Sequence, residues 1–154
     1  MLRALELAKK GKTTPNPMVG AVLVKKGSVI SEGFHLYAGG PHAEVVALRK
    51  AGKKAKGADL YVNLEPCCHE GRTPPCTDVI IKSGVSRVFA GMKDPNKRVC
   101  GKGIRALKAA GIKVYIGLMK NDCEKLNEVF VKVMKTRLPF VTMKTAISLD
   151  GKIA

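Results

Sequence analysis

Short apolar runs alternate along the chain with longer segments in which apolar residues recur at helical spacing. The apolar runs predict five strands, at residues 19–25, 28–33, 59–64, 87–91 and 112–116. The helical spacing predicts five helices, at residues 2–10, 41–50, 74–82, 103–110 and 121–136. A Lys26-Gly27 turn separates the first two strands, so these two strands are expected to form an antiparallel hairpin.

This order of elements predicts an α/β fold. Helices of about 8–15 residues between strands imply a mostly parallel sheet with helices on both faces. Together with the hairpin, the pattern predicts a three-layer α/β/α sandwich around a five-stranded mixed sheet. A chain of 154 residues suits one domain with a substantial core.

The last segment, residues 139–154, breaks the alternation. Its pattern predicts a strand at 140–144 and a turn at 148–152, after which the chain stops. We therefore expect one domain over residues 1–138, followed by the opening of a second domain that this polypeptide does not contain.

The net charge of the chain bears on its possible binding partners. It is +16, from 28 Lys plus Arg against 12 Asp plus Glu. Such a balance raises the possibility of a nucleic-acid partner. The basic residues are spread along the whole chain, however, and the aromatic residues that stack on single strands make up only 5%. We expect no nucleic acid, and we note that a positive field also suits a small phosphorylated substrate.

Two further patterns bear on location. No apolar run reaches the roughly 18 residues of a membrane span. The N-terminal segment 1–10 is too short and too charged for a secretory signal. We expect a cytoplasmic protein without a membrane partner.

The five cysteines indicate metal binding rather than disulfides. Their number is odd and three of them lie within ten positions, whereas a disulfide framework needs pairs and a secreted context. They are Cys67, Cys68, Cys76, Cys100 and Cys123.

Three short segments carry the candidate chemistry: His42-Ala43-Glu44, Pro66-Cys67 and Pro75-Cys76. They supply one imidazole, two thiolates and one carboxylate, a set that suits one zinc ion with an open coordination position. His-x-Glu followed by Pro-Cys and a further Cys is the arrangement of zinc-dependent nucleobase deaminases. We predict that His42, Cys67 and Cys76 bind one Zn²⁺ per chain and that Glu44 is the catalytic proton carrier.

Other interpretations remain open at this point. Cys67, Cys68, His69 and Cys76 offer a closed structural zinc site, although two adjacent thiolates point poorly at one ion and structural sites prefer spaced pairs. A nucleobase or tRNA deaminase is a second alternative. Eight residues separate Cys67 from Cys76, however, where the generic signature has two, which argues against a standard cytidine or tRNA-adenosine deaminase.

The long loop carries a specific resemblance. Residues 64–76, LEPCCHEGRTPPC, closely resemble the corresponding loop of the riboflavin-biosynthesis diaminohydroxyphosphoribosylaminopyrimidine deaminases, which belong to the cytidine deaminase-like superfamily. Further segments resemble the same family, at residues 14–22, 33–35, 40–44, 91–96 and 101–104. Position 68 is usually Ser in this family, so Cys68 is not expected to bind the metal.

The resemblance implies a hydrolytic reaction. The 2-amino group leaves 2,5-diamino-6-ribosylamino-4(3H)-pyrimidinone 5′-phosphate as ammonia, and 5-amino-6-ribosylaminouracil 5′-phosphate is formed. Zinc activates the water that attacks C2. Glu44 accepts a proton from that water and gives it to the ring nitrogen, and in a later, separate step it protonates the leaving amine.

The family's motifs also imply residues that hold the base and the ribose. By motif position, Asn16 and His69 are expected to hold the pyrimidine, and Asp94 and Asn96 are expected to bind the ribose hydroxyls. Without the resemblance, Asp94-Pro95-Asn96 predicts only an ordinary turn.

Cations at three further motif positions suit the substrate phosphate. Arg72, His35 and Lys144 are expected to bind it, because fork-shaped and point cations both bind phosphate well. Without the resemblance, Lys144 is a solvated lysine on a strand.

In this family the deaminase is usually the first half of a bifunctional deaminase-reductase. Residues 1–138 therefore correspond to a zinc-dependent deaminase domain, and residues 139–154 resemble the start of a reductase domain. NADPH is expected only where that missing domain is present. Family members self-associate, which implies a homo-oligomer.

Overall fold

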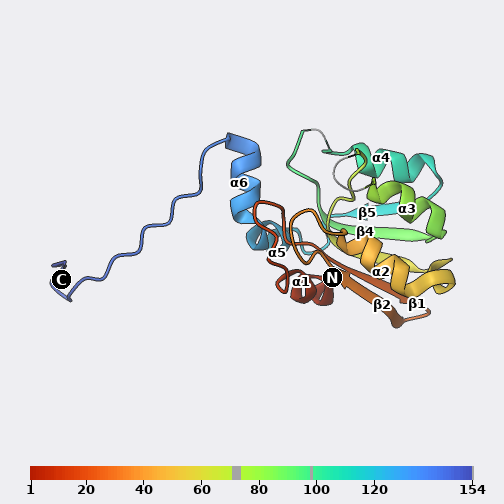
Figure 1. The fold of residues 1–154 in the computed structure, drawn as a ribbon, viewed down its shortest axis with the longest axis horizontal. Helices are drawn as coiled ribbons and strands as arrows, with labels where there is room; N and C mark the ends of the chain where they lie inside the picture. The colour runs from red at the N-terminus through yellow and green to blue at the C-terminus, as the bar shows by residue number, and fades with distance from the viewer. Residues whose placement is uncertain (71–73, 98, 154) are drawn as a thin grey trace.

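The computed structural model describes residues 1–70, 74–97 and 99–153. They form an open five-stranded sheet in the order β2-β1-β3-β4-β5 (Figure 1). The strands are β1 (Gly20–Lys25), β2 (Ser28–Phe34), β3 (Asp59–Leu64), β4 (Arg87–Met92) and β5 (Lys113–Ile116). Each lies within two residues of its predicted bounds, because alternation and apolar runs are a direct signal for strands.

The sheet is mixed, as predicted. β1 pairs antiparallel with both β2 and β3, while β3 pairs parallel with β4, and β4 with β5. The expectation of a mostly parallel sheet holds for strand direction, because β2, β3, β4 and β5 all run the same way. The hairpin makes β1 antiparallel to β2, and β1 is also antiparallel to β3 on its other side, so β1 alone runs opposite to the other four strands.

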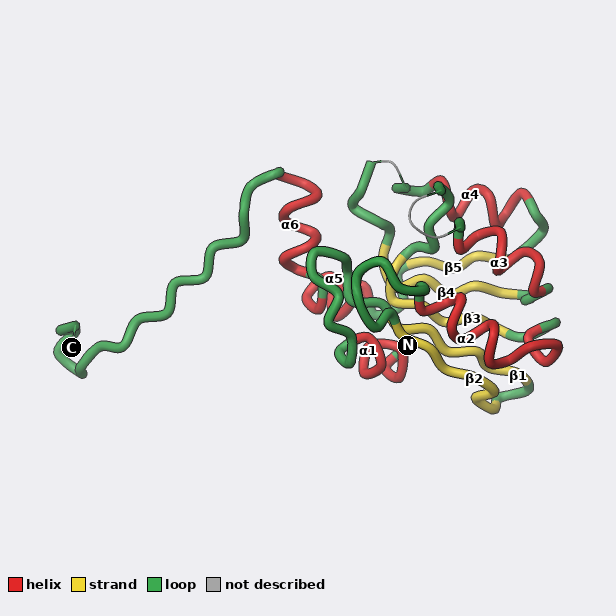
Figure 2. The backbone as a smooth tube through the Cα atoms, viewed as in Figure 1, coloured by secondary structure: helices red, strands yellow, loops and turns green. Residues whose placement is uncertain are grey.

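Helices cover the sheet on both faces and complete the three layers (Figure 2). α2 (Ala43–Ala51), α3 (Cys76–Ser83) and α4 (Lys102–Ala109) pack side by side on one face. α1 (Leu2–Ala8) and α5 (Lys120–Leu126) lie on the other face. A short 3₁₀ turn, η1 (Gly52–Ala55), follows α2.

Alternation along β1 shows how the two faces are filled. Leu23 belongs to the main core between the sheet and α2, α3 and α4, whereas its neighbour Val22 packs with Ala4 and Leu7 of α1. Successive strand side chains point to opposite faces, so one six-residue strand serves two apolar layers.

Leu23 offers a direct test of this core, because its side chain is fully buried. Leu23→Ala should lower the free energy of unfolding by about 2–5 kcal/mol, through lost burial and the cavity left behind. Urea unfolding measures the loss. Leu2→Ala makes the same change on a residue that is 66% exposed in α1, and it should change stability by no more than about 0.5 kcal/mol.

The helix predicted at 121–136 is interrupted, and the structure has two helices there, α5 and α6 (Glu128–Thr136). Asn127 separates them, with φ −110° and ψ 25°. Its side chain accepts a hydrogen bond from the Met18 amide (2.8 Å) and donates one to the Met18 carbonyl (3.0 Å). An Asn side chain that bonds backbone elsewhere favours a helix end over a helix interior.

After α6 the chain runs away from the body of the molecule (Figure 1). The strand predicted at 140–144 is wrong: these residues are not in a strand and are exposed. The predicted turn at 148–152 is confirmed, since the Ser148 amide donates to the Lys152 carbonyl at 2.9 Å. The domain boundary at residue 138 stays a prediction.

Candidate active site

The three predicted metal ligands converge where two helices begin. His42 precedes the first residue of α2, Cys67 follows β3, and Cys76 opens α3. The ligand atoms of these three residues all lie within 4.8 Å of one another. His42 Nδ1 is 3.0 Å from Cys76 Sγ and 3.5 Å from Cys67 Sγ, so Nδ1 is the nitrogen that faces both sulfurs.

The start of α3 fixes the two cysteines relative to each other. The Cys76 amide donates to Cys67 Sγ at 3.3 Å, and the Thr77 amide donates to the Cys67 carbonyl at 3.1 Å. Hydrogen bonds from Cys76 and His42 lower the pKa of the Cys67 thiol to about 4. The pKa of Cys76 is raised, because its proton is shared with Cys67 and because it is buried.

These donors fit zinc. Zinc takes Cys sulfur and His nitrogen at about 2.0–2.3 Å in a tetrahedral arrangement, so its ligand atoms lie within about 4 Å of one another. Three protein ligands leave the fourth position for water or substrate, as in catalytic sites. Among the described residues, neither Cys68 nor His69 belongs to this group, which weighs against the closed structural site.

Glu44 lies in the first turn of α2, beside the cluster but outside the ligand group. Glu44 is only 3% exposed, and it is one of the residues that line a cavity above the cluster. Burial raises its pKa above the ordinary value of a glutamate. A buried carboxyl with a raised pKa is suited to accepting and returning a proton near neutral pH.

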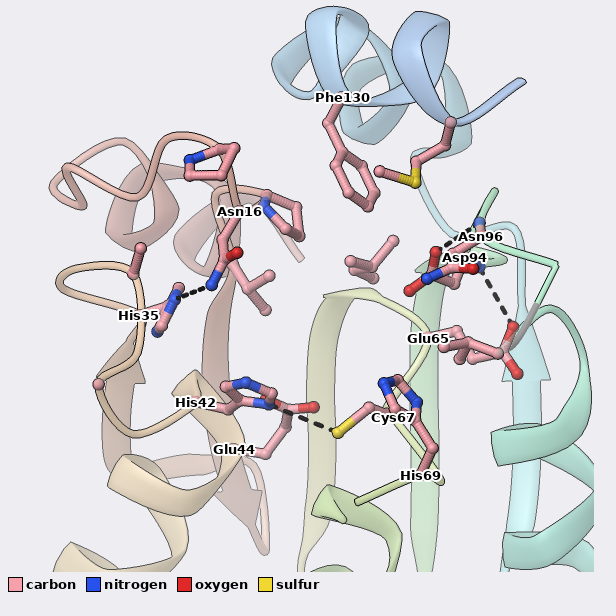
Figure 3. Close-up of a pocket in the computed structure, with 18 of the residues that line it drawn as sticks. Asn16, His35, His42, Glu44, Glu65, Cys67, His69, Asp94, Asn96 and Phe130 are labelled. Atoms are coloured by element: carbon pink, nitrogen blue, oxygen red, sulfur yellow. Dashed lines mark hydrogen bonds between the residues drawn. The ribbon is translucent and has the colours of Figure 1, made fainter. Parts of the chain in front are cut away.

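The cluster lies at the base of a cavity of about 550 Å³. Figure 3 shows Asn16 and His35 on one side of it, Asp94 and Asn96 on the opposite side, and His42, Glu44 and Cys67 between them. This volume lies within the range of small-molecule sites.

His35 holds Asn16 in place. Its Nδ1 lies 3.1 Å from the Pro41 carbonyl and its Nε2 lies 3.2 Å from Asn16 Nδ2. The carbonyl requires a proton on Nδ1, so Nε2 accepts from the Asn16 amide. Burial lowers the pKa of His35, which therefore lines the pocket as a neutral ring. This geometry supports positioning of Asn16 more than the expected contact with phosphate.

Asp94 and Asn96 form the turn that their spacing predicts, since the Asn96 amide donates to Asp94 Oδ1 at 2.8 Å. Glu65, which the sequence reasoning missed, anchors this loop. Its buried carboxylate accepts from the amides of Asp94 (3.2 Å), Gly101 (2.9 Å) and Ile104 (3.2 Å). Its only signal in the sequence is a carboxylate at the end of an apolar strand, directly before Pro66-Cys67.

Asp94 gives the site a pH-dependent stability. Burial raises the pKa of Asp94 to about 6, so the folded state binds its proton more tightly than the unfolded state does. Ionising Asp94 in the folded state therefore lowers the free energy of unfolding. This loss is absent below the unfolded pKa of about 4 and reaches its full size above pH 6.

We therefore expect Asp94→Asn to raise the free energy of unfolding at pH 7.5 by about 1–3 kcal/mol, with little effect at pH 4. The amide oxygen of Asn can still accept the bond from Asn96. Urea unfolding at both pH values measures the difference. Equal effects at the two pH values would contradict the buried ionisation.

The remaining predicted substrate residues are placed differently. His69 lines the pocket. Arg72 lies outside the described residues. Lys144 is exposed in the segment after α6 and does not line the pocket. The expected contacts of all three with substrate stay predictions.

Sequence reasoning missed two apolar lining residues, Phe130 and Met134 of α6. The helical spacing of Phe130 within residues 121–136 indicates only an apolar stripe on a helix. In the structure no residue of α6 is fully buried, and Phe130 points into the cavity instead (Figure 3).

Comparison with known proteins identifies the class of this site. The model of the cytidine and deoxycytidylate deaminase zinc-binding region matches residues 1–92, and the chain belongs to that family. The family is a zinc-binding one, in agreement with the donor set found here. Of the described residues, none lies in a helix long and apolar enough to cross a membrane.

Within this family the chain is similar to riboflavin biosynthesis proteins, which confirms the resemblance seen in the sequence. It is 55% identical over 156 residues to the riboflavin biosynthesis protein RibD of Escherichia coli, covering 100% of this chain and 42% of that protein. The chain thus spans less than half the length of that relative.

Solved structures agree with this likeness. The Thermotoga maritima diaminohydroxyphosphoribosylaminopyrimidine deaminase/5-amino-6-(5-phosphoribosylamino)uracil reductase matches with TM-score 0.94 and 51% identity, over 100% of this chain and 45% of that one. The Aspergillus oryzae Rib2 deaminase, solved in complex with DARIPP, matches with TM-score 0.68 and 26% identity, over 87% of this chain and 91% of that one. The five-stranded mixed sheet is therefore the cytidine deaminase-like fold predicted from the sequence.

Proposed function

We propose that this chain catalyses hydrolytic deamination of 2,5-diamino-6-ribosylamino-4(3H)-pyrimidinone 5′-phosphate. The observation that carries the proposal is the convergence of His42, Cys67 and Cys76 beside buried Glu44 at the base of a cavity. The substrate is supported by the similar Thermotoga maritima protein, which is described as a diaminohydroxyphosphoribosylaminopyrimidine deaminase.

Each group of the cluster has a distinct role in the proposed reaction. His42, Cys67 and Cys76 hold the zinc ion, which lowers the pKa of a water molecule to near neutral. Glu44 takes a proton from the attacking water and delivers it to the ring nitrogen next to C2. The water oxygen becomes bonded to C2 as a hydroxyl. Glu44 then takes the remaining proton of that hydroxyl and gives it to the 2-amino group, so the C2–N bond breaks, ammonia leaves and a carbonyl remains at C2.

The sides of the cavity orient the substrate. Asn16, fixed by His35, is placed to hydrogen-bond the pyrimidine edge. Asp94 and Asn96, on the loop tied to Glu65, suit the ribose hydroxyls on the other side. A base held between these two sides lies over the metal cluster with its C2 amino group toward Glu44.

We further infer that the protein is a cytoplasmic homo-oligomer and that it binds no nucleic acid. NADPH is expected to bind only where a reductase domain accompanies this chain, as the double name of the Thermotoga maritima relative suggests.

A substrate panel tests the proposal. Ammonia release should be fastest with the diaminopyrimidine ribosyl phosphate, slower with its dephosphorylated form, and at background with cytidine and deoxycytidylate. Ammonia release from cytidine, deoxycytidylate or tRNA, with none from the diaminopyrimidine phosphate, would favour the alternative of a nucleobase deaminase.

A further inference from the structure

Helix α6 supplies an apolar wall to the cavity on the side away from the metal cluster (Figure 3). Phe130 and Met134 line the cavity from α6, and both side chains are only partly buried. Figure 3 shows Phe130 pointing into the cavity from the side opposite His42 and Cys67. An aromatic side chain that is only partly buried in the free protein has apolar surface left to cover.

One buried residue helps to fix the position of this wall. Asn127, which is 3% exposed, precedes α6 and makes two side-chain hydrogen bonds to the backbone of Met18. The Met18 carbonyl also accepts from the side-chain amide of Asn63 on β3. Asn127 thus ties α6 to the sheet through the loop that carries Asn16.

The geometry fits a flat ligand. A pyrimidine held by Asn16 at its edge, above the metal cluster, presents one ring face toward α6. An aromatic ring packs well on a heteroaromatic face, and the contact excludes water from the charged groups beneath.

We propose that Phe130 packs against the pyrimidine and, with Met134, closes the pocket over it, while Asn127 acts as a positioning residue for this wall. The inference rests on the proposed function and assigns a specificity role to a helix beyond the matched zinc-binding region, residues 1–92.

Kinetics of Phe130→Ala test the contact. KM for the diaminopyrimidine phosphate should rise at least about tenfold, with kcat lowered less than about threefold, because a contact to the base is lost while the metal and Glu44 are untouched. Phe130→Leu should lie between the wild type and Phe130→Ala. Val129→Ala is the matched control, because Val129 lies on the same helix, is 51% exposed and does not line the cavity.

Fluorescence provides a readout that general damage to the fold would not mimic. The chain has no Trp, so Phe130→Trp introduces a single reporter. In a Glu44→Gln background, which slows turnover enough for a titration, its emission should change saturably as the diaminopyrimidine phosphate is added. Val129→Trp in the same background should not respond.

The outcomes separate this proposal from the proposed function. If the wild type releases ammonia but Phe130→Ala has unchanged KM and Phe130→Trp does not respond, the wall is not part of the binding site. If zinc content also falls in Phe130→Ala, its effect is structural and the proposal is overturned. If the wild type neither binds nor turns over this substrate, the proposed function fails, and the contact with this base fails with it.

Discussion

Replacing Glu44 with glutamine should lower kcat for ammonia release by about 10²–10⁴-fold, while one zinc ion per chain stays bound. Glutamine keeps the size of the side chain but cannot accept the proton of the attacking water. The buried position of Glu44, beside but outside the ligand group, is the reason that chemistry and metal binding should separate.

Ammonia assay and metal analysis on the same preparation measure both quantities. Glu6→Gln is the control, because Glu6 is an exposed glutamate whose ion pair with Arg3 is a surface one. It should leave kcat unchanged. A Glu44→Gln protein with near wild-type kcat would remove Glu44 from the mechanism.

Replacing Cys76 with serine should remove both zinc and activity. Losing a group that merely hydrogen-bonds a metal ligand weakens metal binding by roughly 10–100-fold, and losing a ligand should cost more. Cys76 is fully buried at the start of α3, where no other thiol replaces it in the described ligand group. Competition with a chromogenic chelator measures the change in affinity.

Cys68→Ser is the matched control, since it makes the same substitution one residue after a predicted ligand. Cys68 lies outside the ligand group, and we expect one zinc ion per chain and wild-type activity. Loss of zinc from Cys68→Ser would restore the closed structural site as the better account.

The sequence predicts the elements well and their pairing less well. The strands come from local alternation, so β3 at Asp59–Leu64 has the predicted bounds. The antiparallel pairing of β1 with β3 joins residues far apart in the chain, and no local pattern encodes it. The break at Asn127 has the same origin, because its hydrogen bonds go to Met18, 109 positions away.

Some residues of the candidate site can likewise be predicted from the sequence, and others cannot. His42, Cys67 and Cys76 are predictable because zinc needs particular donor atoms, and donors of that kind are rare in the chain. Glu65 accepts hydrogen bonds from the amides of Asp94 and Gly101, which lie far from it in the sequence. Phe130 lines a cavity that is formed mostly by residues distant from it in the chain. An acidic and an aromatic residue have too many ordinary uses for their type alone to reveal such roles.

Incubation of the zinc-loaded wild-type protein with the diaminopyrimidine ribosyl phosphate in H₂¹⁸O is the most direct test of the central claim. We predict ammonia release together with a uracil product that carries one ¹⁸O atom at C2, and neither from protein stripped of zinc. Absence of ammonia from the zinc-loaded protein, or a product without ¹⁸O, would contradict hydrolytic deamination at this site.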